Sequence, residues 1–258
     1  MKGFKITFLG TCACDFSPKL NTEFKDKFDN DARRASSILI NEKYLVDCGP
    51  HALDSMRILN KGIDEIEDII ITHLHDDHFD KDNIAKIALV KDTPLRLWVR
   101  EDAVLESIPN VEIKRMRLLE KTQIGELCVT GMSANHDKSA YPQHLLIEME
   151  DKKIFYGCDG GWLLNDTYNS LWHAEIDLAV LDCTVGDYEG DYRLAEHNSI
   201  PMLRLMIASL KTIGAINEKT KIYLSHIAPS LHAPHEKTVE LADAFGASVA
   251  YDGLKIEV

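Results

Sequence analysis

Apolar and polar segments alternate along the chain and predict a mixed succession of strands and helices. Short apolar runs rich in valine and isoleucine predict strands at 4–9, 37–40, 44–46, 69–72, 95–99, 127–130, 145–149, 154–156, 178–181, 222–225, 248–251 and 254–258. Longer periodic segments predict helices at 51–60, 80–91, 199–213 and 234–245. In the last helix Pro234 lies in the first turn and Gly246 follows the end, an arrangement typical of helix termini.

The order of these elements indicates the fold class. Predicted strands occur in both halves of the chain, and helices interrupt each group. We therefore expect an α/β (α+β) fold, a four-layer αββα sandwich in which two mixed sheets pack face to face with helices outside. No linker-like composition divides the sequence, which predicts a single domain over residues 1–258. The mixed charge run from Asn21 to Arg34 predicts a solvated loop.

Composition narrows the class of protein. The formal net charge of -13 disfavours extended nucleic-acid binding, because such binding depends on Lys and Arg displacing counterions from phosphates. No apolar stretch is long enough to span a bilayer, and the start MKGFKITFLG leads directly into a strand pattern rather than a signal peptide. We expect a cytoplasmic protein that acts on a small-molecule substrate and does not associate with a membrane. The formation of a homodimer stays open.

The cysteines are scattered along the chain, and most lie inside apolar runs. This is the usage of small buried hydrophobic residues. Cys12 and Cys14 form a C-x-C pair that has no second pair to complete a metal site. We therefore expect structural packing rather than metal binding by cysteine.

The segment richest in chemistry runs from Ile69 to His78, a buried strand that leads into three histidines and two aspartates. Because alternate side chains at a strand end point the same way, His73 and His75 can meet one cation. The following turn directs Asp77 and His78 toward a second. Neighbouring imidazoles without a partner compete for charge and desolvation, so two metal sites explain the pattern better than a solvated loop.

The His-x-His-x-Asp-His pattern of residues 73–78 resembles the signature of the metallo-β-lactamase superfamily, and Asp47 lies where that family has a supporting Asp-x-Gly. The resemblance implies a dinuclear metal-dependent hydrolase with a sandwich fold. Each later candidate ligand follows an apolar run. The resemblance implies His73, His75 and His136 for the first metal, Asp77, His78 and His226 for the second, and Asp159 as the bridge.

This ligand set leaves open positions for a shared water, whose pKa two cations would lower from ~15.7 toward neutrality. Such a water would attack the ester. Nitrogen-rich ligation with carboxylates favours zinc, while manganese and iron stay open.

The segment Ala195–Ser199 resembles the His-x-Ser/Thr element of the superfamily's phosphodiesterase branch, which includes tRNA 3′-processing nucleases and PhnP-type cyclic-phosphate phosphodiesterases. Ser199 stands where it can cap the helix 199–213. His197 is then a candidate general acid, since an alkoxide leaves poorly without a proton. Asp77 is the second candidate catalytic residue.

Arg33, Arg34 and Ser36 are candidate phosphate contacts, against the alternative of an ordinary salt-bridged loop. Only sixteen residues separate Gly160 from Asp177, which leaves no room for the basic arm of a tRNA-processing enzyme. We therefore expect a small or cyclic phosphodiester as substrate. Two other functions stay open: a lactonase, carboxylic ester or thioester hydrolase, and a non-catalytic metal-binding module.

Overall fold

Two seven-stranded sheets form the centre of the computed structural model, which describes residues 3–258. The first sheet has the order β14-β1-β2-β3-β4-β5-β6 and the second β13-β12-β11-β10-β9-β8-β7. The strands of the first sheet are β1 (Lys5–Gly10), β2 (Ser37–Ile40), β3 (Tyr44–Val46), β4 (Asp68–Ile70), β5 (Leu95–Arg100), β6 (Val111–Met116) and β14 (Lys255–Glu257). Those of the second are β7 (Lys121–Ile124), β8 (Leu127–Ser133), β9 (Gln143–Met149), β10 (Lys152–Gly157), β11 (Leu178–Asp182), β12 (Lys221–Ser225) and β13 (Ser248–Val249).

Both sheets follow the same plan. Strands β14, β1, β2 and β3 pair antiparallel, whereas β3, β4, β5 and β6 pair parallel. In the second sheet β7 to β10 pair antiparallel and β10 to β13 pair parallel. Parallel strands place their carboxyl ends at one edge of a sheet, where polar groups from successive loops can meet.

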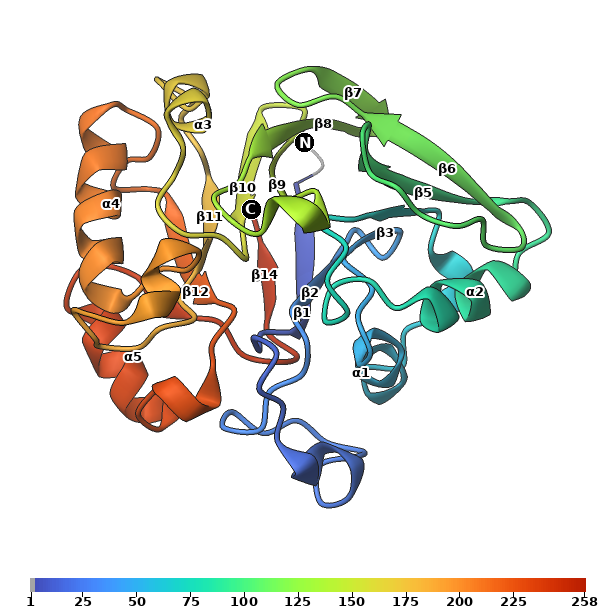
Figure 1. Cartoon of the computed structure of the whole chain (residues 1–258), viewed down its shortest axis with the longest axis horizontal. Coiled ribbons are helices and arrows are strands. Elements are labelled where there is room, and N and C mark those ends of the chain that lie inside the picture. Colours follow the sequence, from blue (N-terminus) through green and yellow to red (C-terminus); the bar gives the residue numbers. More distant parts are fainter. Residues whose placement is uncertain (1–2) are drawn as a thin grey trace.

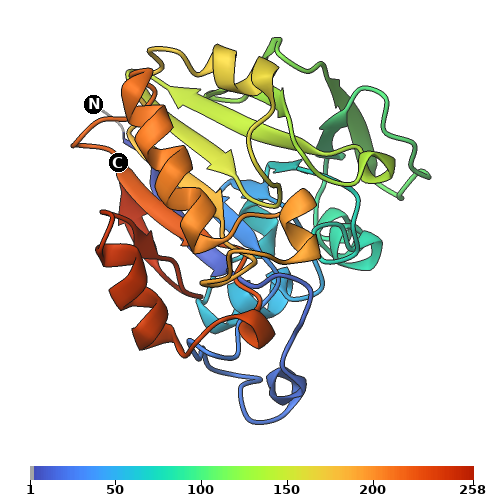
Figure 2. The same ribbon diagram turned by 60° about the vertical axis from the view of Figure 1, so that its left-hand side comes forward.

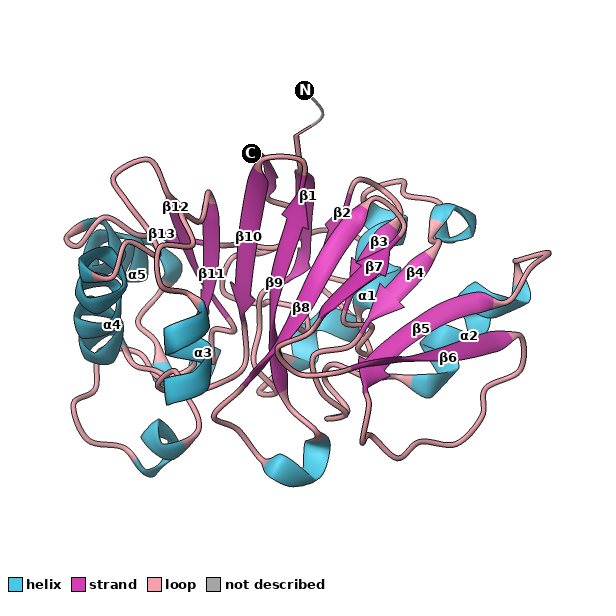
Figure 3. Ribbon diagram, turned by 90° about the horizontal axis from the view of Figure 1, so that it is seen from above, coloured by secondary structure: helices cyan, strands magenta, loops and turns pink. Residues whose placement is uncertain are grey.

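Helices cover the outer face of each sheet, and the four layers are visible from above (Figure 3). The helices are α1 (Ala52–Ile58), α2 (Lys81–Leu89), α3 (Asn165–Ser170), α4 (Ile200–Thr212) and α5 (His235–Asp243). In Figure 1, α1 and α2 lie on the right and α3, α4 and α5 on the left. Figure 2 shows α4 and α5 in front of the second sheet. The predicted αββα sandwich is confirmed.

Each interface between layers has its own apolar core. Between the sheets pack side chains such as Phe8 and Leu145, both fully buried. Leu203 of α4 belongs to the core under α3, α4 and α5, and Ile84 of α2 to the core under α1 and α2. The strands thus bury side chains on both faces, which explains why their sequences are continuous apolar runs rather than alternating ones.

The sequence located most of these elements to within a few residues, but β6, β7 and α3 were not predicted. β6 and β7 are the edge strands at the same end of the two sheets. Their sequences VEIKRM and KTQI are largely polar because an edge strand faces solvent. α3 is a short helix, and its sequence NDTYNS is polar and rich in residues that are common in turns. That residues 1–258 form a single domain stays a prediction.

Two local predictions were correct only in part. The charge run at 21–34 forms a loop, but Arg33 and Arg34 at its end are 2% and 1% exposed rather than solvated. Ser199 occupies the N-cap position of α4, yet its side chain makes no capping hydrogen bond, and Oγ has no partner among residues 3–258. Gly246 does follow α5 with φ +79, a conformation that favours glycine. Among the described residues, none of the helices has the length and apolar character to cross a bilayer.

Candidate metal centre

The candidate metal ligands lie in loops that follow the carboxyl ends of strands from both sheets. The loop after β4 carries the four ligands of residues 73–78. His136 follows β8, and Asp159 and His226 follow the parallel strands β10 and β12. Residues that are far apart in the sequence therefore converge where the edges of the two sheets meet.

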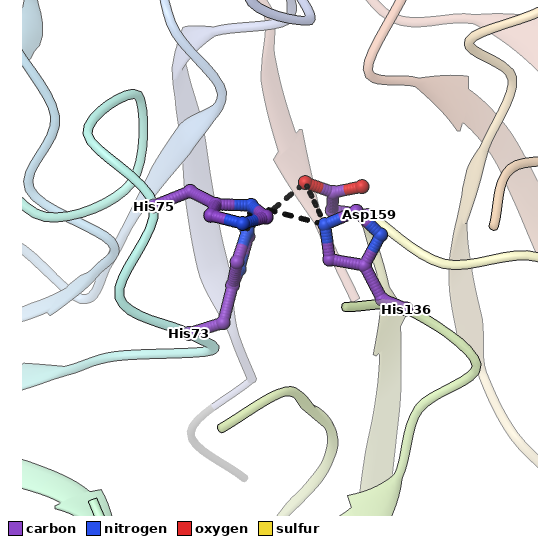
Figure 4. Close-up of side chains that lie close together, drawn as sticks. All are labelled: His73, His75, His136 and Asp159. Carbon is purple, nitrogen blue, oxygen red and sulfur yellow. Dashed lines mark hydrogen bonds and ion pairs between the residues drawn. The ribbon is translucent and has the colours of Figure 1, made fainter. Parts of the chain in front are cut away.

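The first group of ligands consists of His73, His75, His136 and Asp159, whose ligand atoms all lie within 4.8 Å of one another (Figure 4). His75 Nδ1 is 3.0 Å from His73 Nε2 and 3.1 Å from His136 Nε2. Asp159 Oδ2 is 3.1 Å from His73 Nε2 and 3.5 Å from His136 Nε2. Three imidazoles and one carboxylate suit a tetrahedral cation such as zinc.

The second group consists of Asp77, His78, Asp159 and His226, again with ligand atoms within 4.8 Å of one another. His78 Nε2 is 3.3 Å from both Asp77 Oδ2 and His226 Nε2. Asp159 Oδ2 is 3.4 Å from the Nε2 atoms of His78 and His226. The same carboxylate oxygen thus faces both groups, which is the geometry of a bridging ligand.

Hydrogen bonds to the Nδ1 atoms of His78 and His226 orient these two ligand histidines. Asp47 Oδ2 is 2.7 Å from His78 Nδ1, so this nitrogen carries a proton and Nε2 is the ring nitrogen directed at the cluster. Thr184 Oγ1 is 2.7 Å from His226 Nδ1 in the same arrangement. Asp47 Oδ1 also accepts from the backbone N–H of Thr72, which fixes the start of the ligand loop. These contacts orient the rings for metal binding.

The backbone is strained at three positions of the cluster. Asp47, Asp159 and His226 have φ values of 62, 58 and 57 degrees, in the left-handed region that non-glycine residues seldom adopt. Such conformations persist only where the surrounding structure imposes them, and they concentrate at functional sites.

Burial and charge set the protonation of the site. Burial lowers the pKa of His73, and burial lowers that of His136 to about 4, so both rings favour the neutral form that binds metals. Burial also lowers the pKa of His226, but Asp159 outweighs it and raises the pKa to about 9. For His78, Asp77 and Asp47 likewise outweigh burial and raise the pKa well above its usual value. The protons on His78 and His226 therefore offset the negative charge of the buried carboxylates. Bound cations would otherwise offset this charge.

His197 lies beside the cluster, and the sequence did not reveal what holds it there. Its Nδ1 is 3.1 Å from Asp182 Oδ2 and 3.2 Å from Asp159 Oδ1. Burial lowers the pKa of His197, but Asp182 outweighs it and raises the pKa to about 11, so the ring is an imidazolium at neutral pH. His197, Asp159, Asp182 and His226 also form a third group with metal-binding geometry.

Asp182 and Thr184 were missed at the level of sequence. Asp182 is fully buried at the end of β11 and contacts both His197 and His226. A signal was available, because Asp182 directly follows the apolar run Leu178–Leu181, as Asp159 follows its own strand.

A pocket of about 280 Å³ opens over the cluster. Its lining residues are Ala13, Cys14, Asp15, His75, Asp77, His136, Asp159, Thr184, Arg193, Glu196, His197, His226, Ala228, Ser230 and Leu231. Cys14 is exposed in this pocket and belongs to neither ligand group. Cys12, by contrast, is buried. Apart from the predicted ligands, His197, the C-x-C residue Cys14 and Glu196 of the segment Ala195–Ser199, no feature of the sequence indicated these residues.

The structure does not bring Arg33, Arg34 or Ser36 to this pocket. Arg33 Nη1 donates to Thr11 Oγ1 and to the Ala250 carbonyl, and Arg34 Nη2 donates to the Phe24 carbonyl. Ser36 Oγ donates to the Cys12 carbonyl. These hydrogen bonds link the loops next to β1 to one another, which accounts for the burial of the three side chains.

The comparisons agree with this architecture. The family model described as "Beta-lactamase superfamily domain" matches residues 42–251, and the chain belongs to this family. No curated protein sequence matches the chain. The fold is similar to the metallo-beta-lactamase fold protein YhfI from Bacillus subtilis, with a TM-score of 0.76, 15% identity and 100% of both chains covered.

Two further solved structures share the fold. Zn²⁺-bound PqqB from Methylobacterium extorquens has a TM-score of 0.73 and 18% identity, over 98% of this chain and 100% of its own. The short form of human tRNase Z has a TM-score of 0.68 and 18% identity, over 98% of both chains. At these identities the likeness shows a common fold.

Proposed function

We propose that the chain is a dinuclear metal-dependent phosphodiesterase that hydrolyses a small or cyclic phosphodiester. The observation that carries the proposal is the shared Asp159 Oδ2, which faces two groups of ligands while its Oδ1 lies 3.2 Å from the imidazolium of His197. Two cation sites and a proton donor thus border one pocket. The human tRNase Z that shares the fold acts, by its name, on tRNA, which agrees with phosphodiester chemistry.

The donor set fits two divalent cations. His73, His75 and His136 would hold the first ion, Asp77, His78 and His226 the second, and Asp159 both. Zinc is the first candidate because nitrogen donors predominate, and the PqqB structure of the same fold binds Zn²⁺. When bound, the two ions would supply Lewis-acid activation of water and of the phosphoryl oxygens.

The residues of the chain would provide the proton transfers. Asp182 occupies Nδ1 of His197, so the proton on Nε2 is free to protonate the departing oxygen of the ester. Asp77 Oδ2 faces the cluster at 3.3 Å from His78 Nε2. We assign its other oxygen to accepting a proton from the attacking water.

Two observations support a small substrate. The pocket volume of about 280 Å³ is at the lower end of the roughly 300–1,000 Å³ of small-molecule sites. The formal net charge of -13 does not favour a long polyanion. A short or cyclic phosphodiester therefore suits this pocket better than a folded RNA.

Paired assays of metal-loaded protein test the proposal. We expect hydrolysis of a 2′,3′-cyclic nucleoside monophosphate, whose leaving group is an alkoxide, and a loss of about 10²-fold in kcat for His197→Ala, because the general acid that protonates this alkoxide is removed. His173→Ala is the matched control, since His173 is exposed and lies outside the pocket. The variant and the control are also assayed on a lactone and a thioester.

The outcomes separate the candidate functions. Turnover of a lactone or thioester but not of the phosphodiester would replace the proposal with a carboxylic ester hydrolase. Metal-loaded protein that turns over none of the three substrates would favour a non-catalytic metal-binding module.

A further inference from the structure

The wall of the pocket contains one cationic side chain other than histidine. Among the pocket-lining residues, all of which are described, Arg193 is the only Lys or Arg. Asp15 and Glu196 are the carboxylates that line the pocket outside the ligand groups. Asp15 is engaged, because its Oδ2 accepts from the backbone N–H of Ser230 at 2.9 Å. Glu196 is a second carboxylate on the same wall, so the guanidinium of Arg193 is the one group there, other than histidine, against which an anion can bind.

The guanidinium of Arg193 is fixed along one edge. Its Nε donates to Asp191 Oδ1 at 2.8 Å, and its Nη2 donates to Asp191 Oδ2 at 2.7 Å. The Asp191 carboxylate also accepts from the backbone N–H of Arg193, so the pair is tied to its own loop. Within residues 3–258 no other hydrogen-bond acceptor contacts the guanidinium, and the Tyr192 ring lies against its face, 5.0 Å from Cζ. The second edge, formed by Nη1 and the remaining N–H of Nη2, can therefore take another planar or tetrahedral oxyanion in two parallel hydrogen bonds.

Arg193 and His197 belong to one short turn. The backbone N–H of His197 donates to the backbone carbonyl of Arg193 at 2.9 Å, which holds the two residues in one turn. His197 would protonate the departing oxygen, so the part of the substrate that leaves lies on this side of the pocket. The ligand groups would hold the scissile phosphate next to His197, whose Nδ1 is 3.2 Å from Asp159 Oδ1.

We propose that Arg193 recognises a second oxyanion, carried on the leaving group of the phosphodiester. This proposal rests on the phosphodiesterase function above and names its substrate class: a phosphodiester whose leaving alcohol bears a carboxylate or a phosphate. The metal ions alone give no reason to prefer such a leaving group, whereas the free edge of Arg193 does.

A matched pair of chromogenic substrates tests the proposal in the metal-loaded protein. Methyl 3-carboxy-4-nitrophenyl phosphate and methyl 4-nitrophenyl phosphate differ by one carboxylate on the leaving group. We expect kcat/KM to favour the carboxylated diester by about tenfold, and Arg193→Gln to bring the ratio close to one. Arg204→Gln is the control, because Arg204 lies on α4, outside the pocket, and contacts Phe245. This control should keep the tenfold ratio.

An equilibrium measurement separates this proposal from the function on which it rests. Calorimetry gives the dissociation constants of the two product phenols, 5-hydroxy-2-nitrobenzoate and 4-nitrophenol, for the wild type and for Arg193→Gln. We expect the wild type to bind the carboxylated phenol about tenfold more tightly and Arg193→Gln to lose that difference. The same titration with 2-hydroxy-5-nitrophenyl phosphate shows which oxyanion the site prefers.

Equal ratios in the wild type and Arg193→Gln, in both catalysis and binding, would overturn the role of Arg193. If neither diester is hydrolysed, the phosphodiesterase proposal fails. The binding arm then still decides whether Arg193 selects an oxyanion.

Discussion

The ligand groups and the wall segment Asp191–His197 border the same pocket but are built differently. His73 and Asp159 are 2% and 4% exposed and are held by contacts from both sheets, whereas Tyr192 of the wall segment is 84% exposed. The chemistry of the site thus depends on buried polar groups that the fold positions. In our proposal, the selectivity of the site depends on a surface turn. We therefore expect variants of the two regions to differ both in the property that is affected and in the size of the effect.

The largest effect is expected at the carboxylate shared by the two ligand groups. Asp159→Ala should lose both cations and lower kcat by at least ~10³-fold, because loss of metal removes several kcal/mol of transition-state stabilisation. Metal analysis and steady-state kinetics measure this together. The exposed Asp151→Ala, in the turn before β10, should behave as the wild type. Retention of both ions by Asp159→Ala would contradict a bridged pair.

The next effect is expected at the residue behind the proton donor. Asp182→Asn should lower kcat by about 10²-fold, because His197 loses the partner that holds its ring. Asp182 raises the pKa of His197, so its removal lowers that pKa. The proton donor would then be lost at a lower pH, and the alkaline limb of the pH–rate profile should move toward neutrality. An alkaline limb that stays in place would show that Asp182 acts otherwise.

A smaller effect is expected at the support of the second ligand group. Asp47→Asn should weaken metal affinity by about 10–100-fold while leaving the ligands themselves present. The reason is the 2.7 Å contact of Asp47 Oδ2 with His78 Nδ1, which an amide cannot match as an acceptor. Competition with a chelator measures the affinity. An unchanged dissociation constant would mean that His78 is oriented by other contacts.

The same difference between regions explains what the sequence could predict. A strand that ends in a dense run of His and Asp indicates metal ligands from the local sequence alone. Residues 73–78 and the later ligands at strand ends could therefore be predicted. Asp182 also follows an apolar run, but its contact with His197 depends on β11 lying beside β10 and β12, which is a long-range property of the sheet. Arg193 lies in a polar turn whose sequence resembles any exposed loop, so only its position over the pocket reveals it.

The sandwich fold was predictable because strands buried on both faces are continuous apolar runs. β6 and β7 escaped because each is the edge strand of its sheet and carries polar residues. Charge usually indicates solvent exposure, yet Arg33 and Arg34 are buried, where carbonyl and hydroxyl groups accept their hydrogen bonds and the buried carboxylate of Asp252 offsets their charge.

Metal binding should release protons at pH 7. His226, with a pKa raised to about 9, and His78 are protonated in the metal-free protein and must lose a proton to offer a lone pair. We expect release of at least about one proton per chain, measured as the dependence of the calorimetric enthalpy on the ionisation enthalpy of the buffer. The release should fall when the pH is raised above 9, since His226 is then neutral before the metal arrives. Metal binding without proton release at pH 7 would contradict this electrostatic description.

The smallest effect is expected on the exposed wall. Tyr192→Ala should change the free energy of unfolding by no more than about 0.5 kcal/mol, because its side chain is 84% exposed. Thermal unfolding measures this. A larger loss would show that the wall segment stabilises the fold and is not a separable surface turn.

The central claim is that seven side chains from distant parts of the chain form two adjacent cation sites. The most direct test is the titration of metal-depleted protein with Zn²⁺, with the bound metal counted per chain in the wild type and in His73→Ala and His226→Ala. We expect two ions per wild-type chain and a loss of metal in each variant, since the variants remove ligands of different groups. Binding of no metal by the wild type, or two ions retained in both variants, would contradict it.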